Sequence, residues 1–168
     1  MAHISGSTSD TLAGEFRNAM AHVCSPVVVV TAFDGDRPHG TTVSAFMSLS
    51  MTPPMVAVAL DQKSDLLTIL DEGKRIGINV LAADQPDLAS QFAKKGLNKF
   101  DQVDWDAERG LPRISGSSIW IECSLAQVVA GGDHSILLGS VEQVGHTVSE
   151  PLTYHARAFG THRSLPPI

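Results

Sequence analysis

The sequence predicts a mainly β protein, an antiparallel barrel with helices packed on its outside. About six runs of residues have the apolar or alternating pattern of strands, and turn-forming residues separate them. Three segments with helical spacing lie between these runs, without the regular strand–helix alternation of parallel sheets. The chain has 168 residues, 43% hydrophobic and 18% charged, enough for one domain with a substantial core. We expect that domain at residues 11–162, after a mobile polar lead-in at 1–10 and before a proline-rich tail at 163–168.

Composition also narrows the function and the compartment. The formal net charge of −6 argues against a general binder of nucleic acid or of membrane surfaces. No apolar run approaches the roughly 20 residues that span a bilayer, and residues 1–10 lack the order of a signal peptide, so we expect a cytoplasmic protein. The isolated Cys24 and Cys123 fit buried, reduced thiols better than a disulfide or metal ligands, and no metal site is predicted. The sequence has no P-loop and no Gly-x-Gly-x-x-Gly motif, which argues against a Rossmann dinucleotide site.

The first predicted elements are a helix and a buried strand. Between residues 11 and 23, apolar side chains recur at helical spacing, which predicts an amphipathic helix that covers the core: Leu12, Phe16, Ala19, Met20 and Val23. Ser25 and Pro26 are expected to end this helix. Residues 27–33 are β-branched and apolar, as in a buried strand, and residues 34–38 have the composition of a hairpin turn.

Residues 39–50 follow as one predicted strand with two different faces. The face expected to meet the core consists of Thr41, Val43, Ala45, Met47 and Leu49. The opposite face carries mostly small hydroxyl side chains: Thr42, Ser44, Phe46, Ser48 and Ser50. A planar, hydrogen-bonding ligand could lie close to such a face, although a face that simply meets solvent would have the same composition. Pro53 and Pro54 are expected to end the strand.

A polar segment follows the next strand. Residues 55–60 are apolar without alternation, which predicts a strand buried on both faces. A short helix is expected at 66–70 with Ser64 as its N-cap, so that free N–H groups beside Lys63 could bind an anion. Plain helix capping is the alternative. Residues 76–80 alternate as a further strand.

A lysine cluster ends the next predicted helix. Asp84 is its expected N-cap, and Pro86 lies in its first turn. Its inner face consists of Leu88, Ala89, Phe92 and Ala93. Lys94 and Lys95 precede Gly96, and Lys99 follows within the same short stretch. These lysines either complement the helix dipole or contact a phosphate.

The C-terminal part is predicted to be irregular at 101–117 and to form a long hairpin after it. Strands at 119–129 and 136–144 are joined through a turn at 131–133, which places His134 on the rim of the barrel. A histidine at such a position is either a solvated turn residue or part of a site. Two short segments follow, at 151–154 and 157–160.

Several short pieces of the chain, taken in order, match one known pattern. They are Gly40-Thr41-Thr42-Val43-Ser44-Ala45-Phe46 with Ser48, Ser50, Pro53 and Pro54; Ser64; Phe92-Ala93 with Lys99-Phe100; Gly132-Asp133-His134 with Ile136 and Gly139; and Pro151-Leu152 with Tyr154 and Arg157. From about Leu12 to Gly160 the chain thereby resembles the flavin reductase family, the reductase components of two-component flavin-dependent monooxygenases. The resemblance implies a six-stranded antiparallel split β-barrel of the FMN-binding type, with Greek-key topology, and a homodimer.

The resemblance also implies the residues of a site. A first group would line the isoalloxazine ring: Thr42, Val43, Ser44, Ala45 and Ser48. A second group would run past the ribityl chain and phosphate: Leu60, Asp61, Gln62, Lys63 and Ser64. A third group would complete the phosphate end: Phe92, Ala93, Lys94 and Lys99. His134 would sit over the flavin where nicotinamide stacks, as the candidate catalytic residue, and Tyr154 would close the pocket.

The implied reaction is hydride transfer from NADH or NADPH to N5 of FMN or FAD, after which the reduced flavin passes to a partner monooxygenase. No position selects FAD over FMN, and the lack of a clear basic cluster for a 2′-phosphate favours NADH. One alternative is a flavoprotein that reduces another acceptor, such as a ferric complex or a quinone. Others are a flavin-binding electron carrier and a structural barrel without a ligand.

Overall fold

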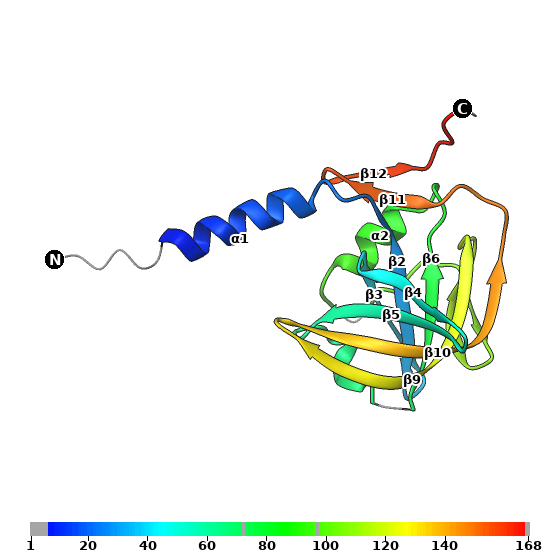
Figure 1. Ribbon diagram of the computed structural model, residues 1–168. Helices are drawn as coiled ribbons and strands as arrows, with labels where there is room; N and C mark the ends of the chain where they lie inside the picture. Colours follow the sequence, from blue (N-terminus) through cyan, green and yellow to red (C-terminus); the bar gives the residue numbers. More distant parts are fainter. Residues whose placement is uncertain (1–6, 72, 97, 167–168) are drawn as a thin grey trace.

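The computed structural model describes residues 7–71, 73–96 and 98–166, and about half of them lie in β-strands (Figure 1). Among them, α1 spans Ser7–Met20, α2 spans Pro86–Ala93, and a short 3-10 helix, η1, spans Leu67–Ile69. The strands are β1 Ser25–Pro26, β2 Val28–Asp34, β3 Arg37–Val43, β4 Phe46–Met51, β5 Pro54–Asp61, β6 Arg75–Val80, β7 Trp105–Glu108, β8 Leu111–Ile114, β9 Ile119–Gly131, β10 His134–His146, β11 Leu152–His155 and β12 Ala158–Thr161. Of the expected lead-in, residues 7–10 begin α1 and residues 1–6 lie outside the described residues, as do residues 167–168 of the expected tail.

Seven strands form one strongly curled antiparallel sheet, in the order β3-β2-β6-β9-β10-β5-β4 (Figure 1). β3 and β4 are consecutive in the chain, yet they lie at opposite edges of this sheet, and only Ser44 and Ala45 connect them. A link of two residues spans roughly 10 Å, so the sheet must curl until its edges meet at this point. The predicted antiparallel, mainly β architecture is confirmed, but the sheet has seven strands instead of six, and no ladder pairs β3 with β4 within the described residues.

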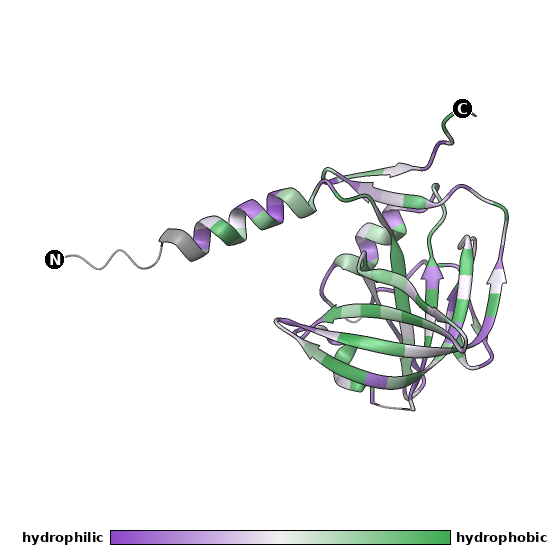
Figure 2. Cartoon of the chain, viewed as in Figure 1, coloured by the Kyte–Doolittle hydropathy of each residue, from purple (hydrophilic) through white to green (hydrophobic). Residues whose placement is uncertain are grey.

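The core has two parts, which lie on opposite faces of the sheet around β2. Val28, Val30 and Ala32 belong to the cluster inside the curled sheet. Val27 and Val29 belong to a second cluster, which includes Ala89 and Phe92 of α2. Figure 2 shows the apolar residues concentrated along the strands. The helix α2 therefore closes the outer face of the sheet beside β3.

The predicted N-terminal helix forms, but it does not cover the core as expected. α1 projects away from the body of the molecule (Figure 1), and the side chains of Leu12 and Phe16 are 67% and 63% exposed. Arg157 Nη2, after β11, donates a 2.7 Å hydrogen bond to Asn18 Oδ1 in the last turns of α1. Helical spacing predicts an apolar stripe but not the surface that covers it, and no described part of this chain does so here. None of the described helices has both the length and the apolar character that crossing a membrane requires.

The single strand predicted at 39–50 is wrong, because the chain leaves β3 at Val43 and starts β4 at Phe46. The strand alternation does not persist across Ser44 and Ala45, where the chain crosses from one sheet edge to the other. As a result, Met47 and Leu49 are 55% and 41% exposed instead of facing the core with the odd-numbered residues of β3. The odd-numbered residues of 43–49 are all apolar in the sequence, so a period-two pattern cannot reveal that the second half turns its other face to the core.

Three smaller predictions are also corrected. The helix expected at 66–70 is only the three-residue η1, whose N-cap is Leu66 and not Ser64. The N-cap of α2 is Gln85 and not Asp84, and the Gln85 side chain instead accepts a 3.0 Å bond from the amide of Ala82. The segment expected to be irregular at 101–117 contains the β7–β8 hairpin. Gly110 and Pro112 are typical of loops, which explains the expectation. In the structure Trp105 packs on Phe33 and Phe100, and this contact holds the hairpin on the sheet.

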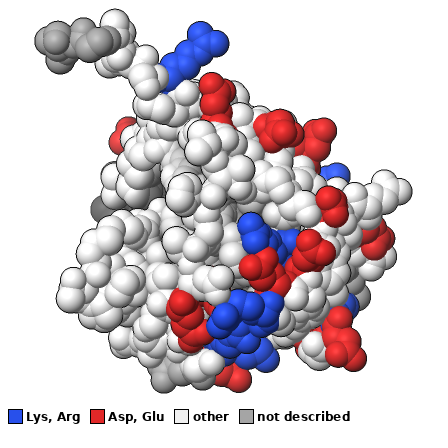
Figure 3. All heavy atoms as spheres, turned by 90° about the vertical axis from the view of Figure 1, so that its right-hand side faces the viewer, with Lys and Arg blue, Asp and Glu red and all other residues white. Residues whose placement is uncertain are grey.

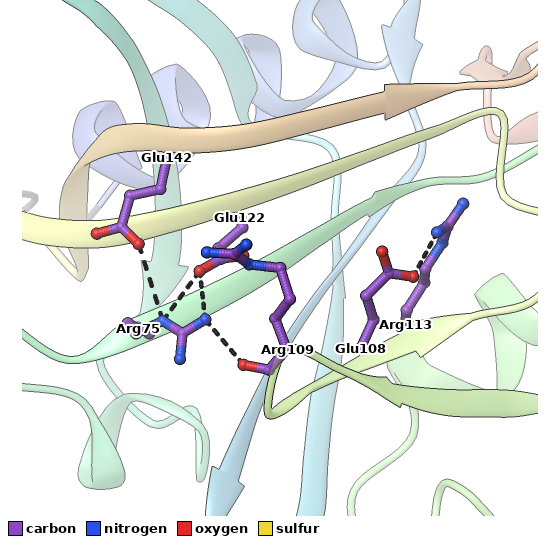
Figure 4. A network of polar contacts seen from close by, with 6 residues as sticks. All are labelled: Arg75, Glu108, Arg109, Arg113, Glu122 and Glu142. Carbon is purple, nitrogen blue, oxygen red and sulfur yellow. Dashed lines mark hydrogen bonds and ion pairs between the residues drawn. The ribbon is translucent and has the colours of Figure 1, made fainter.

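An ion-pair network holds the loop between β7 and β8 to the strands β6, β9 and β10 (Figure 4). Glu122 of β9 is fully buried and accepts hydrogen bonds from Arg75 and, at 2.7 Å, from Arg109 Nε. Burial alone would raise the pKa of Glu122, but the hydrogen bonds and charges of the two arginines outweigh this effect and lower the pKa. On the face shown in Figure 3, acidic and basic side chains lie interspersed.

Candidate functional site

A cavity of about 350 Å³ lies where the two edges of the curled sheet meet. Four segments line it: the β3–β4 crossing, the end of β5 with the loop after it, the segment after α2, and the start of β10. Its lining residues are Thr41, Thr42, Val43, Ser44, Ala45, Ala59, Leu60, Asp61, Lys63, Ser64, Asp65, Ala93, Lys94, Lys95, Lys99 and His134. The curl of the sheet therefore brings together segments that are far apart in the sequence.

The β3–β4 crossing and the end of β3 line this cavity with Thr41, Thr42, Val43, Ser44 and Ala45. Ala59 N donates a 3.0 Å hydrogen bond to Ala45 O, which fixes the crossing against β5. Thr42 Oγ1 donates at 2.7 Å to Ala89 O, so this hydroxyl ties β3 to α2 and can offer a ligand only an acceptor. The row of hydroxyls expected along one strand is accordingly divided between β3 and β4, and the residues at 42–45 that line the cavity all have small side chains.

The loop after β5 is shaped by its own polar groups. Asp61 Oδ1 accepts a 2.7 Å hydrogen bond from the amide of Lys63, and the amide of Ser64 donates to Asp61 O at 2.9 Å. The Ser64 amide is thus already paired, which removes the reason for expecting a helix-terminal anion site there. Lys63 lines the cavity and brings a positive charge to this side of it.

Three lysines after α2 place positive charge on another wall of the cavity: Lys94, Lys95 and Lys99. Lys99 Nζ donates to Gly40 O at 3.2 Å and to Phe92 O at 3.1 Å, which anchors the lysine between β3 and α2. Burial lowers the pKa of Lys99 from its usual value. A side chain at Gly40 would meet the ring of Phe92 at 2.9 Å, so the close approach of α2 requires glycine here.

His134 lines the cavity from the first position of β10. Its Nδ1 lies 2.7 Å from Asp133 Oδ1, and a carboxylate can only accept, so Nδ1 carries the hydrogen and Nε2 is left for other partners. This hydrogen bond, followed by the charge of His134, lowers the pKa of Asp133. The turn before His134 is supported by Gln62, whose Nε2 donates to Gly132 O at 3.1 Å.

Most of the residues expected in the site line this one cavity, but four do not. Ser48 lies on β4 opposite Val56, and Gln62 supports the hairpin turn. Phe92 is fully buried against Phe100, although its carbonyl holds Lys99. Tyr154 lines a neighbouring cavity.

Sequence reasoning left out four residues that line the cavity: Thr41, Ala59, Asp65 and Lys95. Lys95 belongs to the lysine cluster that the sequence does reveal, and Thr41 and Asp65 adjoin predicted residues. Ala59 gives no signal, because it is one small apolar residue within a buried strand.

Comparisons with known proteins extend this description. The family model described as flavin reductase like domain matches residues 20–163. The reductase component of 4-nitrophenol 4-monooxygenase/4-nitrocatechol 2-monooxygenase from Rhodococcus opacus is 36% identical over 146 residues, 87% of this chain and 79% of the relative. FMN reductase (NADH) SmoA from Agrobacterium fabrum is also 36% identical over 146 residues, 86% of this chain and 83% of that one. The structure of the styrene monooxygenase flavin reductase from Pseudomonas putida S12 superposes with a TM-score of 0.82 at 28% identity, covering 91% of this chain and 99% of that one.

The chain is a β protein whose curled sheet forms a cavity between its two edges, and the cavity has the size of a small-molecule site. The family match covers most of the chain. The chain belongs to the flavin reductase like domain family, which confirms the resemblance found in the sequence.

Proposed function

We propose that this chain catalyses hydride transfer from a reduced nicotinamide nucleotide to N5 of a flavin and then releases the reduced flavin to a monooxygenase. The observation that carries this proposal is the shared lining of one cavity by the β3–β4 crossing, the lysine cluster and His134. The volume of about 350 Å³ lies in the range of small-molecule sites. The residues present fit a flavin, because main-chain groups suit the edge of its ring system and lysines suit its phosphate.

The residues of this chain would bind and orient the two reactants. The backbone at 42–45 would lie along the planar ring, and Lys63, Lys94 and Lys99 would hold the phosphate. His134, fixed by Asp133, would position the nicotinamide over the ring. When bound, the flavin and the nicotinamide supply the hydride chemistry, so the protein's contribution is orientation and the exclusion of water.

Named relatives support the finer parts of the proposal. SmoA is named an FMN reductase that uses NADH, and the Rhodococcus opacus relative is named a reductase component of a monooxygenase. We therefore propose NADH over NADPH, FMN or FAD as the flavin, and a flavin-dependent monooxygenase as the partner. We also propose that the curled sheet corresponds to the split barrel of the FMN-binding type.

A homodimer is the simplest way to cover the exposed stripe of α1. Leu12, Phe16 and Met20 lie at helical spacing and are all exposed. A second copy could bury these residues, and size-exclusion chromatography with light scattering would measure the dimer directly. Substituting all three residues with serine should then yield a monomer.

The test of the reaction is aerobic oxidation of NADH or NADPH by the purified protein, without flavin and with FMN, FAD or riboflavin. Oxidation that depends on added flavin supports a flavin reductase, and the same series shows the preferred flavin and nicotinamide. A protein that binds FMN but oxidises neither nicotinamide would be an electron carrier. Reduction of a ferric complex or a quinone by a flavin that stays bound would indicate a different acceptor.

A further inference from the structure

A second cavity, of about 410 Å³, adjoins the first. The two share Thr42 and Val43 at the end of β3, Ser44 of the β3–β4 crossing, and Ala93 at the end of α2. On its outer side the second cavity is lined by Tyr154 of β11, Phe159 of β12 and Arg157 in the turn between them. We call it the aromatic lobe.

The aromatic lobe has a different chemical character from the first cavity. Tyr154 and Phe159 are directly paired across β11 and β12, with ring centroids 5.3 Å apart and planes inclined at 60°. The two residues are 37% and 41% exposed, although large aromatic side chains usually gain from burial. Partly exposed aromatic rings that line a cavity can serve as a surface on which nucleotide bases stack.

Charge at the aromatic lobe also favours an anionic nucleotide. Arg157 is the one charged side chain among the described residues that line it, so no described carboxylate opposes a phosphate there. The guanidinium is held in place by the 2.7 Å hydrogen bond from Nη2 to Asn18 Oδ1. Lys94 lines the first cavity directly after Ala93, which both cavities share.

The boundary between the two cavities is fixed by the fold. The hydrogen bond from Thr42 Oγ1 to Ala89 O holds β3 against α2, and Ala93 offers only a methyl group. The residues that line both cavities are Thr42, Val43, Ser44 and Ala93, and none of them has a long or aromatic side chain. A mononucleotide would occupy the first cavity alone. A dinucleotide carries a second ring system, linked through a diphosphate, and this ring system would lie in the second cavity.

We propose that the aromatic lobe binds the adenine ring of a dinucleotide by stacking on Tyr154 and Phe159. The inference rests on the proposed function, since it extends the same site. Both FAD and NADH carry adenosine diphosphate, and this shared chemistry is what the aromatic pair and Arg157 would recognise. Binding of the nucleotide would thus combine lysine contacts in the first cavity with ring stacking in the second.

The experiment compares each dinucleotide with its mononucleotide by equilibrium binding. Flavin fluorescence gives Kd for FAD and FMN, and calorimetry gives Kd for NAD+ and nicotinamide mononucleotide. The variants are Tyr154→Ala, Phe159→Leu and, as the conservative change, Tyr154→Phe. Val144→Ala is the matched control, because Val144 is an exposed apolar residue of β10 that lines neither cavity. Thermal melts establish which variants fold, and Phe159→Leu keeps apolar cover on β11.

Stacking of a base on an aromatic side chain predicts a Kd about 10-fold weaker for one dinucleotide in Tyr154→Ala, with its mononucleotide within about 2-fold. A selective loss of FAD assigns the lobe to the flavin, and a selective loss of NAD+ assigns it to the nicotinamide nucleotide. Equal effects on dinucleotide and mononucleotide, or no effect in Tyr154→Ala and in Phe159→Leu, overturn the proposal. Because these are binding measurements, they remain decisive even if the wild-type chain oxidises no nicotinamide, which would refute only the proposed reaction.

Discussion

Nδ1 of His134 donates a 2.7 Å hydrogen bond to Oδ1 of the adjacent Asp133, at the start of β10 and on the wall of the cavity. The bond joins two neighbouring residues, and it sets which imidazole nitrogen remains for a ligand. The positioning role proposed for His134 therefore depends on a partner that the hairpin turn itself supplies.

Replacing His134 should separate turnover from flavin binding. We expect His134→Ala to lower kcat by about 10-fold, because the nicotinamide loses its orientation, while the Kd for flavin changes by less than about 2-fold. Asp133→Asn should have a smaller effect in the same direction, since it frees the imidazole without removing it. Steady-state kinetics and flavin fluorescence measure the two quantities, and small, equal effects on both would argue against the role.

The lysine cluster should distinguish FMN from riboflavin, which lacks the phosphate. We expect Lys94→Ala and Lys99→Met to weaken FMN binding by about 10-fold and to leave riboflavin binding nearly unchanged. The preference of the wild type for FMN should also fall as salt is added. Lys74→Ala, outside the cavity lining, serves as the control. If riboflavin and FMN weakened equally, the lysines would be supporting the fold of the site and not the phosphate.

The network around Glu122 predicts an asymmetry in stability. Glu122 is fully buried, whereas Arg75 and Arg109 keep partly exposed side chains that can turn to solvent. Arg75→Leu should therefore destabilise by about 3 kcal/mol, because it leaves a buried charge short of a partner, and Glu122→Gln by only about 1 kcal/mol. Urea unfolding measures both. Flavin binding should be unaffected, and a larger cost for Glu122→Gln would contradict this account.

His39 should make stability depend on pH. Burial, followed by the charges of Arg37 and Lys99, lowers its pKa below 6.5, against the weaker opposing effects of Asp65 and Asp34. The unfolded chain then binds the proton first, so stability is full above about pH 6.5 and falls as the pH drops from there toward the folded pKa.

Urea midpoints of the wild type should consequently be higher at pH 7.5 than at pH 5.5, and His39→Gln should reduce this difference. His146→Gln, which changes an exposed histidine of β10, is the control. A difference that persists undiminished in His39→Gln would assign the pH dependence to other groups.

Short sequence patterns predicted those residues of the candidate site that lie within a single turn or at the end of a single helix. The turn residues before His134 and the lysines after α2 are visible as short patterns, and the structure places both at the cavity. The crossing at Ser44 and Ala45 was not predictable, because strand alternation continues on both sides of it. The hydroxyl of Thr42 was assigned to a ligand, and only the packing of α2 on β3 shows that it bonds to Ala89 O.

The same limit explains the two least accurate predictions about helices. Periodicity located α1 and its apolar residues, but the surface that would cover Leu12 and Phe16 is not encoded in the spacing. For the segment before η1, a serine followed by apolar residues resembled a capped helix. The chain forms a short loop there instead of a helix, because the carboxylate and carbonyl of Asp61 accept hydrogen bonds from the amides of Lys63 and Ser64.

Because Ser44 and Ala45 join opposite edges of one sheet, the cavity exists only when the whole sheet has formed and curled. No fragment of the chain contains it, since its walls come from segments near residues 42, 62, 94 and 134. A ligand of this cavity therefore binds the native state alone, and its binding free energy adds to the stability of the entire domain. Occupancy of the cavity and resistance to unfolding are thus thermodynamically linked, so the domain with an empty cavity lies closer to unfolding than the domain with a bound ligand.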